Sequence, residues 1–281
     1  MRMSICEQAG CLLIALAALI PDAAKPQEAR PEAAPIRGVL RRLSDSTWKN
    51  RRDAFYGLIG GAQPDIGGSV KELLQNYPDE ADSISLALIG LLERENAALA
   101  ESARRGEKIG RGEEYSDYYA NVIWAVTSLK DIRSMDALIG AIATGGMVTR
   151  TLAEFAPQSV EAVLARTADP DPHVRSSTLA FLCEMLSPPY DEKVGTPGFR
   201  SKIKEAFLRG VKDKEGVVRA VAVRGLGALG DPDVIPIVAH LAEHDPDHYP
   251  SRYHPGGRRY WVRESATKAL EELRAKTRKA Q

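Results

Sequence analysis

Two histidines and a glutamate near the C-terminus have the spacing of a metal site. His240, Glu243 and His244 form the pattern H-x-x-E-H, and residues 240–261 hold four of the five histidines of the chain. Histidines four residues apart lie on one side of a helix within reach of one Zn²⁺ ion, and the glutamate could act as base for a metal-bound water. The pattern predicts a metal-binding protein or a metal-dependent hydrolase, with His240 and His244 as ligands.

The helix around this pattern favours a simpler interpretation. At 100° per residue, Val238, Leu241 and Ala242 cluster on one side of the helix. His240 and His244 fall on the opposite flank, so both imidazoles are expected to face solvent. A zinc protease would also need a third acidic ligand well downstream, and the chain ends at residue 281. Plain surface histidines are therefore expected, and the metal site is kept as an alternative.

The loop after these histidines is a stronger candidate for a functional surface. It runs from Asp245 to Val262 and is far longer than the corresponding loops of the repeats described below. Tyr, Trp and Arg are the side chains that most often anchor interfaces, and insertions in repeat proteins collect on a binding face. The predicted partner-binding residues are Tyr249, Tyr253, His254, Arg258, Arg259, Tyr260 and Trp261. A disordered loop, or one that only packs on itself, is the alternative.

The helices that must position these residues recur along the sequence. Residues 169–175 read DPDPHVR and residues 213–219 read DKEGVVR, with Asp, Val and Arg at the same places, and residues 262–263 repeat the final Val-Arg. Small or apolar residues stand four, eight and eleven positions after each Val: Thr178, Ala222 and Ala266; Leu182, Leu226 and Leu270; Met185, Leu229 and Leu273. These steps mark one buried stripe along a helix. Residues 45–51 are a looser fourth copy.

Pairs of helices follow from this pattern over most of the chain. Each copy leads through a turn into a second apolar helix, and weaker helical patterns fill residues 66–167. One pair cannot bury its apolar faces alone, so neighbouring pairs must stack on each other. The sequence predicts an all-α fold, an α-solenoid of about six to seven helix pairs over residues 41–278.

The arrangement resembles the HEAT-repeat family, especially the short bacterial HEAT-like repeats of the PBS-lyase type. The resemblance covers roughly residues 40–275 and is closest over residues 213–232, which end in the turn Gly-Asp-Pro. In that family the loop aspartate caps the helix and pairs with an arginine along the stack. The resemblance therefore implies that Asp169, Arg175, Asp213 and Arg219 are structural ladder residues. Some proteins with such repeats are chromophore lyases or DNA-repair enzymes, which gives a further alternative.

Two other motifs are better explained by these helices than by catalysis. Gly225, Gly227 and Gly230 fit the G-x-G-x-x-G of dinucleotide sites, but the aligned helices carry other residues there and continue as helices. Close helix packing at the first two glycines and a helix end at the third are expected. Ser201 and Lys204 match S-x-x-K without the S-D-N and K-T-G elements of acylating enzymes. No catalytic residue and no cofactor is predicted.

Most aromatic residues outside the long loop lie in predicted helices of the first half. Trp48, Tyr115, Tyr118, Tyr119 and Trp124 are the prominent ones. Rings at helical spacing usually pack in a core. We expect them in the core or between repeats and not on a ligand-binding surface.

The first 24 residues have the build of a secretory signal. Arg2 precedes an apolar run over residues 9–20, and Pro-Asp-Ala-Ala closes it, so cleavage is expected near Ala24. A buried or amphipathic first helix is the alternative, and the run is too short to span a membrane. Residues 25–40 are rich in Pro, Ala and charge and predict a solvated linker. A bacterial periplasmic or secreted location follows, and Cys183 would be the one cysteine left after cleavage.

The composition narrows the class of partner. The chain has 38 basic and 38 acidic side chains, hence no net charge, and no basic block dominates either half. A nucleic-acid partner is therefore not expected. The sequence as a whole predicts an exported, non-catalytic scaffold that binds another protein or peptide. The alternatives are a metal-binding protein or hydrolase centred on His240 and His244, and a lyase or nucleic-acid repair enzyme.

Overall fold

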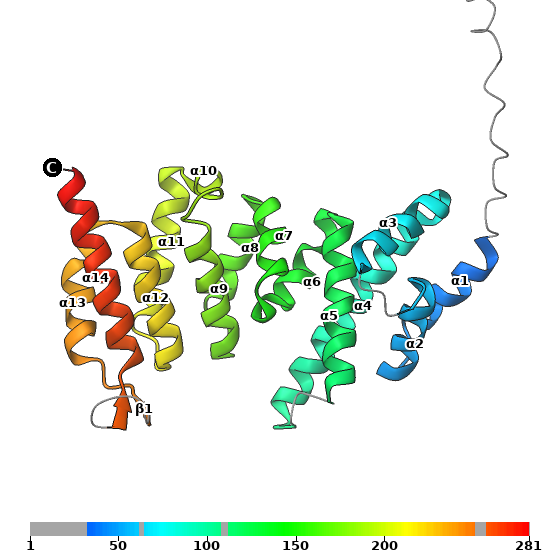
Figure 1. Ribbon diagram of the computed structural model, residues 1–281, viewed down its shortest axis with the longest axis horizontal. Helices are drawn as coiled ribbons and strands as arrows, with labels where there is room; N and C mark the ends of the chain where they lie inside the picture. The colour runs from blue at the N-terminus through cyan, green and yellow to red at the C-terminus, as the bar shows by residue number, and fades with distance from the viewer. Residues whose placement is uncertain (1–32, 62–64, 108–111, 251–256, 281) are drawn as a thin grey trace, which may run out of the picture.

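The protein is a row of stacked helices. The computed structural model describes residues 33–61, 65–107, 112–250 and 257–280, so the predicted signal segment over residues 1–24 lies outside the described residues. Within these ranges fourteen α-helices follow one another from α1 at one end of the molecule to α14 at the other (Figure 1). The prediction of an all-α solenoid is confirmed. None of the helices described is long and apolar enough to cross a membrane.

The helices of the N-terminal half are α1 (Ala33–Arg42), α2 (Trp48–Leu58), α3 (Ile66–Asn76), α4 (Ala81–Arg104), α5 (Glu113–Leu129), α6 (Met135–Gly140) and α7 (Met147–Glu154). Those of the C-terminal half are α8 (Gln158–Arg166), α9 (Pro172–Glu184), α10 (Asp191–Val194), α11 (Pro197–Gly210), α12 (Gly216–Leu229), α13 (Ile235–His244) and α14 (Trp261–Ala280). Short 3₁₀ helices are η1 (Pro78–Glu80), η2 (Ile132–Ser134), η3 (Ile142–Thr144) and η4 (Pro232–Val234). Strands β1 (Tyr249–Pro250) and β2 (Arg258–Arg259) form an antiparallel hairpin.

The first helix begins inside the stretch predicted to be a linker. Helix α1 includes residues 33–40 of the predicted linker over residues 25–40, and its Ile36 side chain is buried. Ile36, Val39, Leu40 and Leu43 recur at helical spacing and join the hydrophobic core. The prediction of a linker was wrong for residues 33–40, because the Pro, Ala and charged residues around this short apolar stripe obscured its helical spacing. The folded part of the chain begins before residue 41.

The apolar stripe inferred from the aligned repeats lies in the core. The residues at its first position are all fully buried, namely Thr178, Ala222 and Ala266. At the second position Leu182 and Leu226 are fully buried, and Leu270 is partly buried and packs against the same core. Helix α12 contacts both α9 and α14, while α11 packs on α12 and α13 packs on α14. The matching positions therefore contribute to the hydrophobic core in successive layers.

Two glycines of α12 allow its neighbours to approach closely. A Cβ atom on Gly225 would lie 2.2 Å from the ring of Phe207 in α11. One on Gly227 would lie 2.8 Å from the Cβ atom of Ala269 in α14. Gly230 ends the helix in the left-handed region, with φ 78°. The G-x-G-x-x-G pattern thus lies within and at the end of a helix, and its glycines serve packing and termination, as predicted.

Replacing a glycine by alanine should change the stability in opposite directions at two positions in different helices. We expect Gly225→Ala to lower the free energy of unfolding by about 1–3 kcal/mol, because the buried Phe207 ring would have to move. Gly90 in α4 has nothing within 4 Å of an added Cβ atom, so Gly90→Ala should raise the free energy of unfolding by up to about 1 kcal/mol. Urea unfolding followed by circular dichroism measures both. Equal stabilisation by the two alanines would contradict close packing at α12.

Candidate functional site

Two arginines connect successive layers in the C-terminal half of the stack. Arg219, near the start of α12, donates through Nη1 to the carbonyl oxygens of Asp213 and Lys214 at 2.8 and 3.0 Å. Its Nε and Nη2 donate to the carboxylate of Asp245 at 2.7 and 3.0 Å. One guanidinium therefore binds the loop before its own helix and the loop of the following layer. A planar fork of fixed donors suits this double contact, and the flexible ammonium of a lysine would not.

Arg175 makes the same contacts one layer earlier. Its Nη1 donates to the carbonyl oxygens of Asp169 and Pro170 at 2.8 and 3.0 Å. Its Nε and Nη2 donate to the carboxylate of Asp213 at 2.7 and 2.8 Å. The structure thus brings the four residues assigned to the ladder into one continuous chain of contacts, which extends through Arg219 to Asp245.

The loop aspartates also organise their own turns. Asp213 accepts a hydrogen bond from the backbone N–H of Glu215 at 2.9 Å, and Asp169 accepts one from that of Asp171 at 2.9 Å. These N–H groups belong to the loop and not to the first turn of the helix, which differs from the helix capping that the family resemblance implies. The hydrogen bonds from Arg175 hold the pKa of the Asp213 carboxyl below its ordinary value, and the hydrogen bond from the Glu215 backbone makes a smaller contribution in the same direction.

The N-terminal end of the stack uses a variant of this contact. Arg51 donates to the carbonyl oxygen of Asp45 at 2.8 Å, but its carboxylate partner is Glu95 in α4, at 2.6 Å. Glu95 is fully buried and accepts hydrogen bonds from the hydroxyls of Tyr115 at 2.9 Å and Tyr118 at 3.0 Å. Burial raises the pKa of the Tyr118 hydroxyl, and the Glu95 carboxylate adds to this. Both oxygens of this buried carboxylate are therefore hydrogen-bonded.

The predicted core aromatics divide into two groups. Trp48 packs edge-on against Tyr115 with ring centroids 5.2 Å apart, and Tyr118 is fully buried beside them. Tyr119 is partly buried and donates its hydroxyl proton to the side-chain oxygen of Asn96 at 2.6 Å. Trp124 does not lie in the core, because 40% of its surface is exposed. Of the two expected places, the core and the space between repeats, the core is wrong for this residue.

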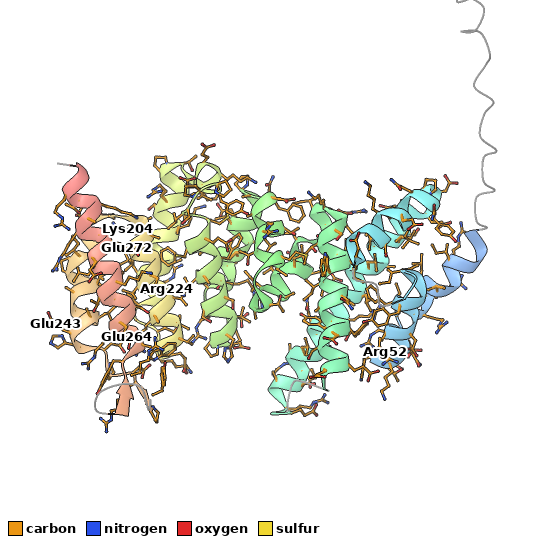
Figure 2. All side chains as sticks on the ribbon, in the orientation of Figure 1. Arg52, Lys204, Arg224, Glu243, Glu264 and Glu272 are labelled. Atoms are coloured by element: carbon orange, nitrogen blue, oxygen red, sulfur yellow. The ribbon has the colours of Figure 1, made fainter. Side chains whose placement is uncertain are left out.

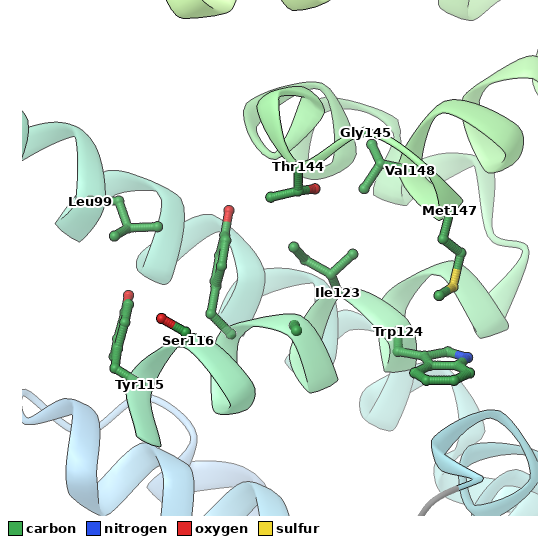
Figure 3. A pocket seen from close by; sticks show the side chains of 12 residues that line it. Leu99, Tyr115, Ser116, Ile123, Trp124, Thr144, Gly145, Met147 and Val148 are labelled. Atoms are coloured by element: carbon green, nitrogen blue, oxygen red, sulfur yellow. The ribbon is translucent and has the colours of Figure 1, made fainter. Parts of the chain in front are cut away.

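Trp124 borders a pocket that the sequence did not indicate. The cavity of about 500 Å³ lies between α4, α5 and the loop that leads into α7 (Figure 3). Its lining is mainly apolar and aromatic, and consists of Leu99, Tyr115, Ser116, Tyr119, Ala120, Ile123, Trp124, Thr144, Gly145, Gly146, Met147 and Val148. The Thr144 hydroxyl donates to the carbonyl oxygen of Ala141. The size and lining are those of sites that bind a small molecule or a large side chain.

The two histidines of the H-x-x-E-H pattern lie side by side on the surface of α13. Both side chains are exposed, and their rings stack with centroids 4.8 Å apart and planes inclined by 9°. Glu243 is also exposed and points outward from α13 (Figure 2). In the part of the chain that the structure describes, no group of three or more His, Cys, Asp or Glu residues could hold a metal ion. The pair has no third ligand among these residues.

The long loop forms a hairpin at the foot of α14 (Figure 1). Tyr249 pairs with Arg259 across the strands, and its hydroxyl accepts a hydrogen bond from Arg259 Nη1 at 2.8 Å. Arg259 also donates to Glu264 at the start of α14, at 2.9 Å. Trp261 lies edge-on to Tyr249 with centroids 6.4 Å apart. These four side chains therefore support each other, yet 39% of the Tyr249 surface remains exposed.

The rest of the hairpin is joined to the end of the ladder. Arg263 donates through Nε to the carbonyl oxygen of Asp245 at 2.6 Å and lies 4.2 Å from the centre of the Tyr260 ring. Arg258 is exposed, and it forms no ion pair with any side chain of the described residues. The predicted contact residues Tyr253 and His254 lie outside the described residues. The structure thus gathers five of the seven predicted residues around one hairpin.

Comparisons with known proteins support the class of fold. Residues 218–244, which span most of α12 together with η4 and α13, match the family described as PBS lyase HEAT-like repeat. The chain therefore carries a HEAT-like repeat at the place where the sequence resembles that family most closely. A search of curated proteins found no match.

Solved structures with a similar arrangement include two engineered proteins of the Northeast Structural Genomics Consortium. One is 13% identical with a TM-score of 0.42, over 86% of this chain and 97% of the engineered one. The other is 13% identical with a TM-score of 0.41, over 85% and 98% of the two chains. The helices stack as an α-solenoid that carries a HEAT-like repeat over residues 218–244. The likenesses to these solved structures assign no activity to the protein.

The ladder should make stability depend on acid. We expect Asp213→Asn to lower the free energy of unfolding at neutral pH by on the order of 3 kcal/mol, because Arg175 would lose its carboxylate partner. Since the pKa of Asp213 is lowered on folding, its contribution is present above the ordinary aspartate pKa of about 3.9. It is lost as pH falls through the lower pKa of the folded state. The difference in the free energy of unfolding between wild type and variant should therefore shrink below about pH 4.

Urea unfolding at a series of pH values measures this gap. The Asp79 side chain is exposed on η1 and has no hydrogen bond or ion pair with the residues described, so Asp79→Asn is a suitable control. It should differ little from wild type at every pH. A gap for Asp213→Asn that stays constant from neutral to acid pH would contradict the assigned role of the Arg175–Asp213 pair.

Proposed function

We propose that this protein is an exported, non-catalytic scaffold that binds another protein or peptide, and that the hairpin between α13 and α14 is a contact surface. The observation that carries the proposal is an insertion whose base is fixed to the ladder while Tyr249 and Arg258 are exposed. A HEAT-like solenoid suits this role, because its stacked pairs offer a long surface without needing a catalytic centre.

The base of the hairpin is held on both sides. Asp245 is buried and receives the Arg219 guanidinium, and its carbonyl oxygen accepts from Arg263. The Asp247 carboxylate lies 2.9 Å from Arg219 Nη2. Contact residues that are positioned by such a fixed base lose little entropy when a partner binds. The described strands of the hairpin therefore present an exposed tyrosine and an exposed arginine, Tyr249 and Arg258, beside this base, and these residue types are frequent in the centres of interfaces.

The location is proposed from the sequence alone. The first 24 residues read as a secretory signal, which favours the bacterial periplasm or secretion. The two alternatives are a metal-dependent protein using His240 and His244, and a lyase or nucleic-acid repair enzyme. The first has no third ligand among the described residues, and the second has in its favour only the name of the family that matches residues 218–244.

A double substitution on the hairpin tests the proposed surface. We expect Tyr249→Ala combined with Arg258→Ala to reduce the partner recovered by the tagged protein from its native cell envelope by at least about tenfold, because exposed Tyr and Arg often dominate binding energy. Crosslinking followed by quantitative mass spectrometry measures recovery. The intact mass of the recovered protein should also show that about the first 24 residues are missing.

A matched variant at the other end of the stack separates binding from general surface effects. Leu86→Ala combined with Arg42→Ala removes one exposed apolar and one exposed basic side chain far along the chain from the hairpin. It should recover the partner as wild type does. Full recovery by the hairpin variant, with unchanged thermal unfolding, would rule out the hairpin as the contact surface. An intact N-terminus on the recovered protein would rule out export by cleavage of the leader.

A further inference from the structure

Helix α5 in the middle of the stack is the counterpart of α12. Leu129, Lys130 and Asp131 end α5 as Leu229, Gly230 and Asp231 end α12. Lys130 and Gly230 both adopt the left-handed region, with φ of 52° and 78°. A non-glycine residue rarely takes this conformation, so the shared turn is informative.

The residues after this turn match as well. Asp131 accepts a hydrogen bond from the backbone N–H of Arg133 at 2.9 Å, and Asp231 accepts one from that of Asp233 at 3.0 Å. Each turn continues into a 3₁₀ helix and then into a second helix, η2 and α6 in one case and η4 and α13 in the other. The layer of α5 and α6 can therefore be compared residue by residue with that of α12 and α13.

The ladder is interrupted in the α5 layer. The position of Arg219 in α12 is taken by Tyr119 in α5, and the position of Asp245 is taken by Gly145. Tyr119 turns to Asn96 for its hydrogen bond. Gly145 and Gly146 have positive φ, and a Cβ atom on either would meet nothing within 4 Å. The guanidinium and the carboxylate that fill this place in the α12 layer are both missing here.

The apolar pocket occupies this interrupted position. Its lining includes Tyr119, Gly145 and Met147, which correspond to Arg219, Asp245 and Asp247 of the regular layer. Figure 3 shows Trp124 and Ile123 of α5 on one side, and Gly145, Met147 and Val148 on the other. A place that elsewhere joins two layers through an ion pair is therefore open to a ligand.

We propose that this pocket binds a large aromatic side chain from an extended, basic peptide segment of a partner. The lining favours an aromatic ring, since Tyr119, the exposed Trp124 and the thioether of Met147 offer ring and sulfur contacts. The missing side chains at Gly145 and Gly146 leave backbone that a peptide main chain can approach. The cavity of about 500 Å³ has room for one such ring and its neighbouring atoms.

The surface of α5 beside the pocket explains why the ligand is a basic peptide. Glu113, Ser116, Asp117, Ala120 and Trp124 are exposed and lie along one face of the helix. This face is roughly 16 Å long, which matches about five residues of extended chain. It is acidic at its start and apolar at the pocket. No side chain among the described residues forms an ion pair with either of its two carboxylates.

Among the described residues, the neighbouring charges leave this acidic end available. Glu114, which lies between the two carboxylates in sequence, is paired with Arg52. Arg105, near the end of α4, is paired with Glu101 and Glu107. A lysine or arginine about three residues from the aromatic side chain would reach the acidic end while the ring occupies the pocket.

Synthetic peptides test this inference directly. The probe is fluorescein-labelled Lys-Ala-Ala-Phe-Ala, made in both sequence orders, with fluorescence anisotropy of the full-length protein as the measurement. We expect the better order to bind about tenfold more tightly than the same peptide with Ala in place of Phe. Replacing Lys by Glu should weaken binding several-fold at low salt and less at high salt, because exposed charges are screened.

Two tryptophan substitutions provide the matched pair. Ala120→Trp should fill the pocket from the exposed face of α5 and weaken the binding of the probe at least about tenfold. Ala97→Trp places the same side chain on the exposed face of α4, where it borders a different hollow, and should leave binding unchanged. Circular dichroism melts show whether both variants remain folded.

The outcomes are distinct. Equal binding of the Phe and Ala peptides, or wild-type binding by a folded Ala120→Trp variant, would overturn the inference. If N-acetylphenylalaninamide competes as well as the unlabelled pentapeptide, peptide recognition is wrong and the pocket takes a small aromatic molecule. This site extends the proposed scaffold function by a second contact. The hairpin variant Tyr249→Ala with Arg258→Ala should bind the probe normally, so the two proposals fail or succeed separately.

Discussion

An arginine that binds two loops at once is the interaction on which the C-terminal half of the stack depends. Arg175 and Arg219 each hold the carbonyl oxygens of their own loop and the carboxylate of the next. Apolar burial drives the stacking of helix pairs, but it is not directional and leaves their register open. A bidentate guanidinium–carboxylate contact has one geometry, so it fixes the position of each loop relative to its neighbour. The hydrophobic stripe and the ladder are therefore complementary.

The partly buried ion pairs of this ladder specify an arrangement more than they add net stability. Removing two charges from water costs much of what their attraction returns, but the loss of one partner leaves the other buried and uncompensated. At the N-terminal end the same task falls to Arg51 and Glu95, with two tyrosine hydroxyls completing the carboxylate's hydrogen bonds. The stack tolerates a change of partner where the new residues satisfy every buried polar atom.

Interruptions of the regular pattern coincide with the candidate binding surfaces. Where the ladder ends, the loop after Asp245 extends into a hairpin with exposed Tyr249. Where the ladder is interrupted by Tyr119 and Gly145, an apolar pocket opens beside Trp124. A repeat protein needs its regular residues for packing, so departures from the repeat are the natural positions for function.

The sequence predicted the regular parts well because local spacing determines them. The stripe through Thr178, Ala222 and Ala266 and the spacing of Asp213 and Arg219 both follow from one helix and its loop. Contacts between distant segments could not be predicted this way, since Glu95 is an ordinary helix residue until Arg51 is placed against it. The helices of the α5 layer were predicted, but their correspondence to α12 and α13 was not, because the ladder residues are replaced there. The matching turns over residues 129–131 and 229–231 were the available signal.

A double-mutant cycle on Arg219 and Asp245 tests the central claim most directly. The free energy of unfolding is measured by urea denaturation for wild type, Arg219→Ala, Asp245→Ala and the double variant. If the pair joins the α12 layer to the next loop, the coupling energy should be at least about 1.5 kcal/mol, with the double variant losing much less than the two single losses combined. Losses that add within about 0.5 kcal/mol would show that the two side chains act independently, which would contradict the ladder as the connection between layers.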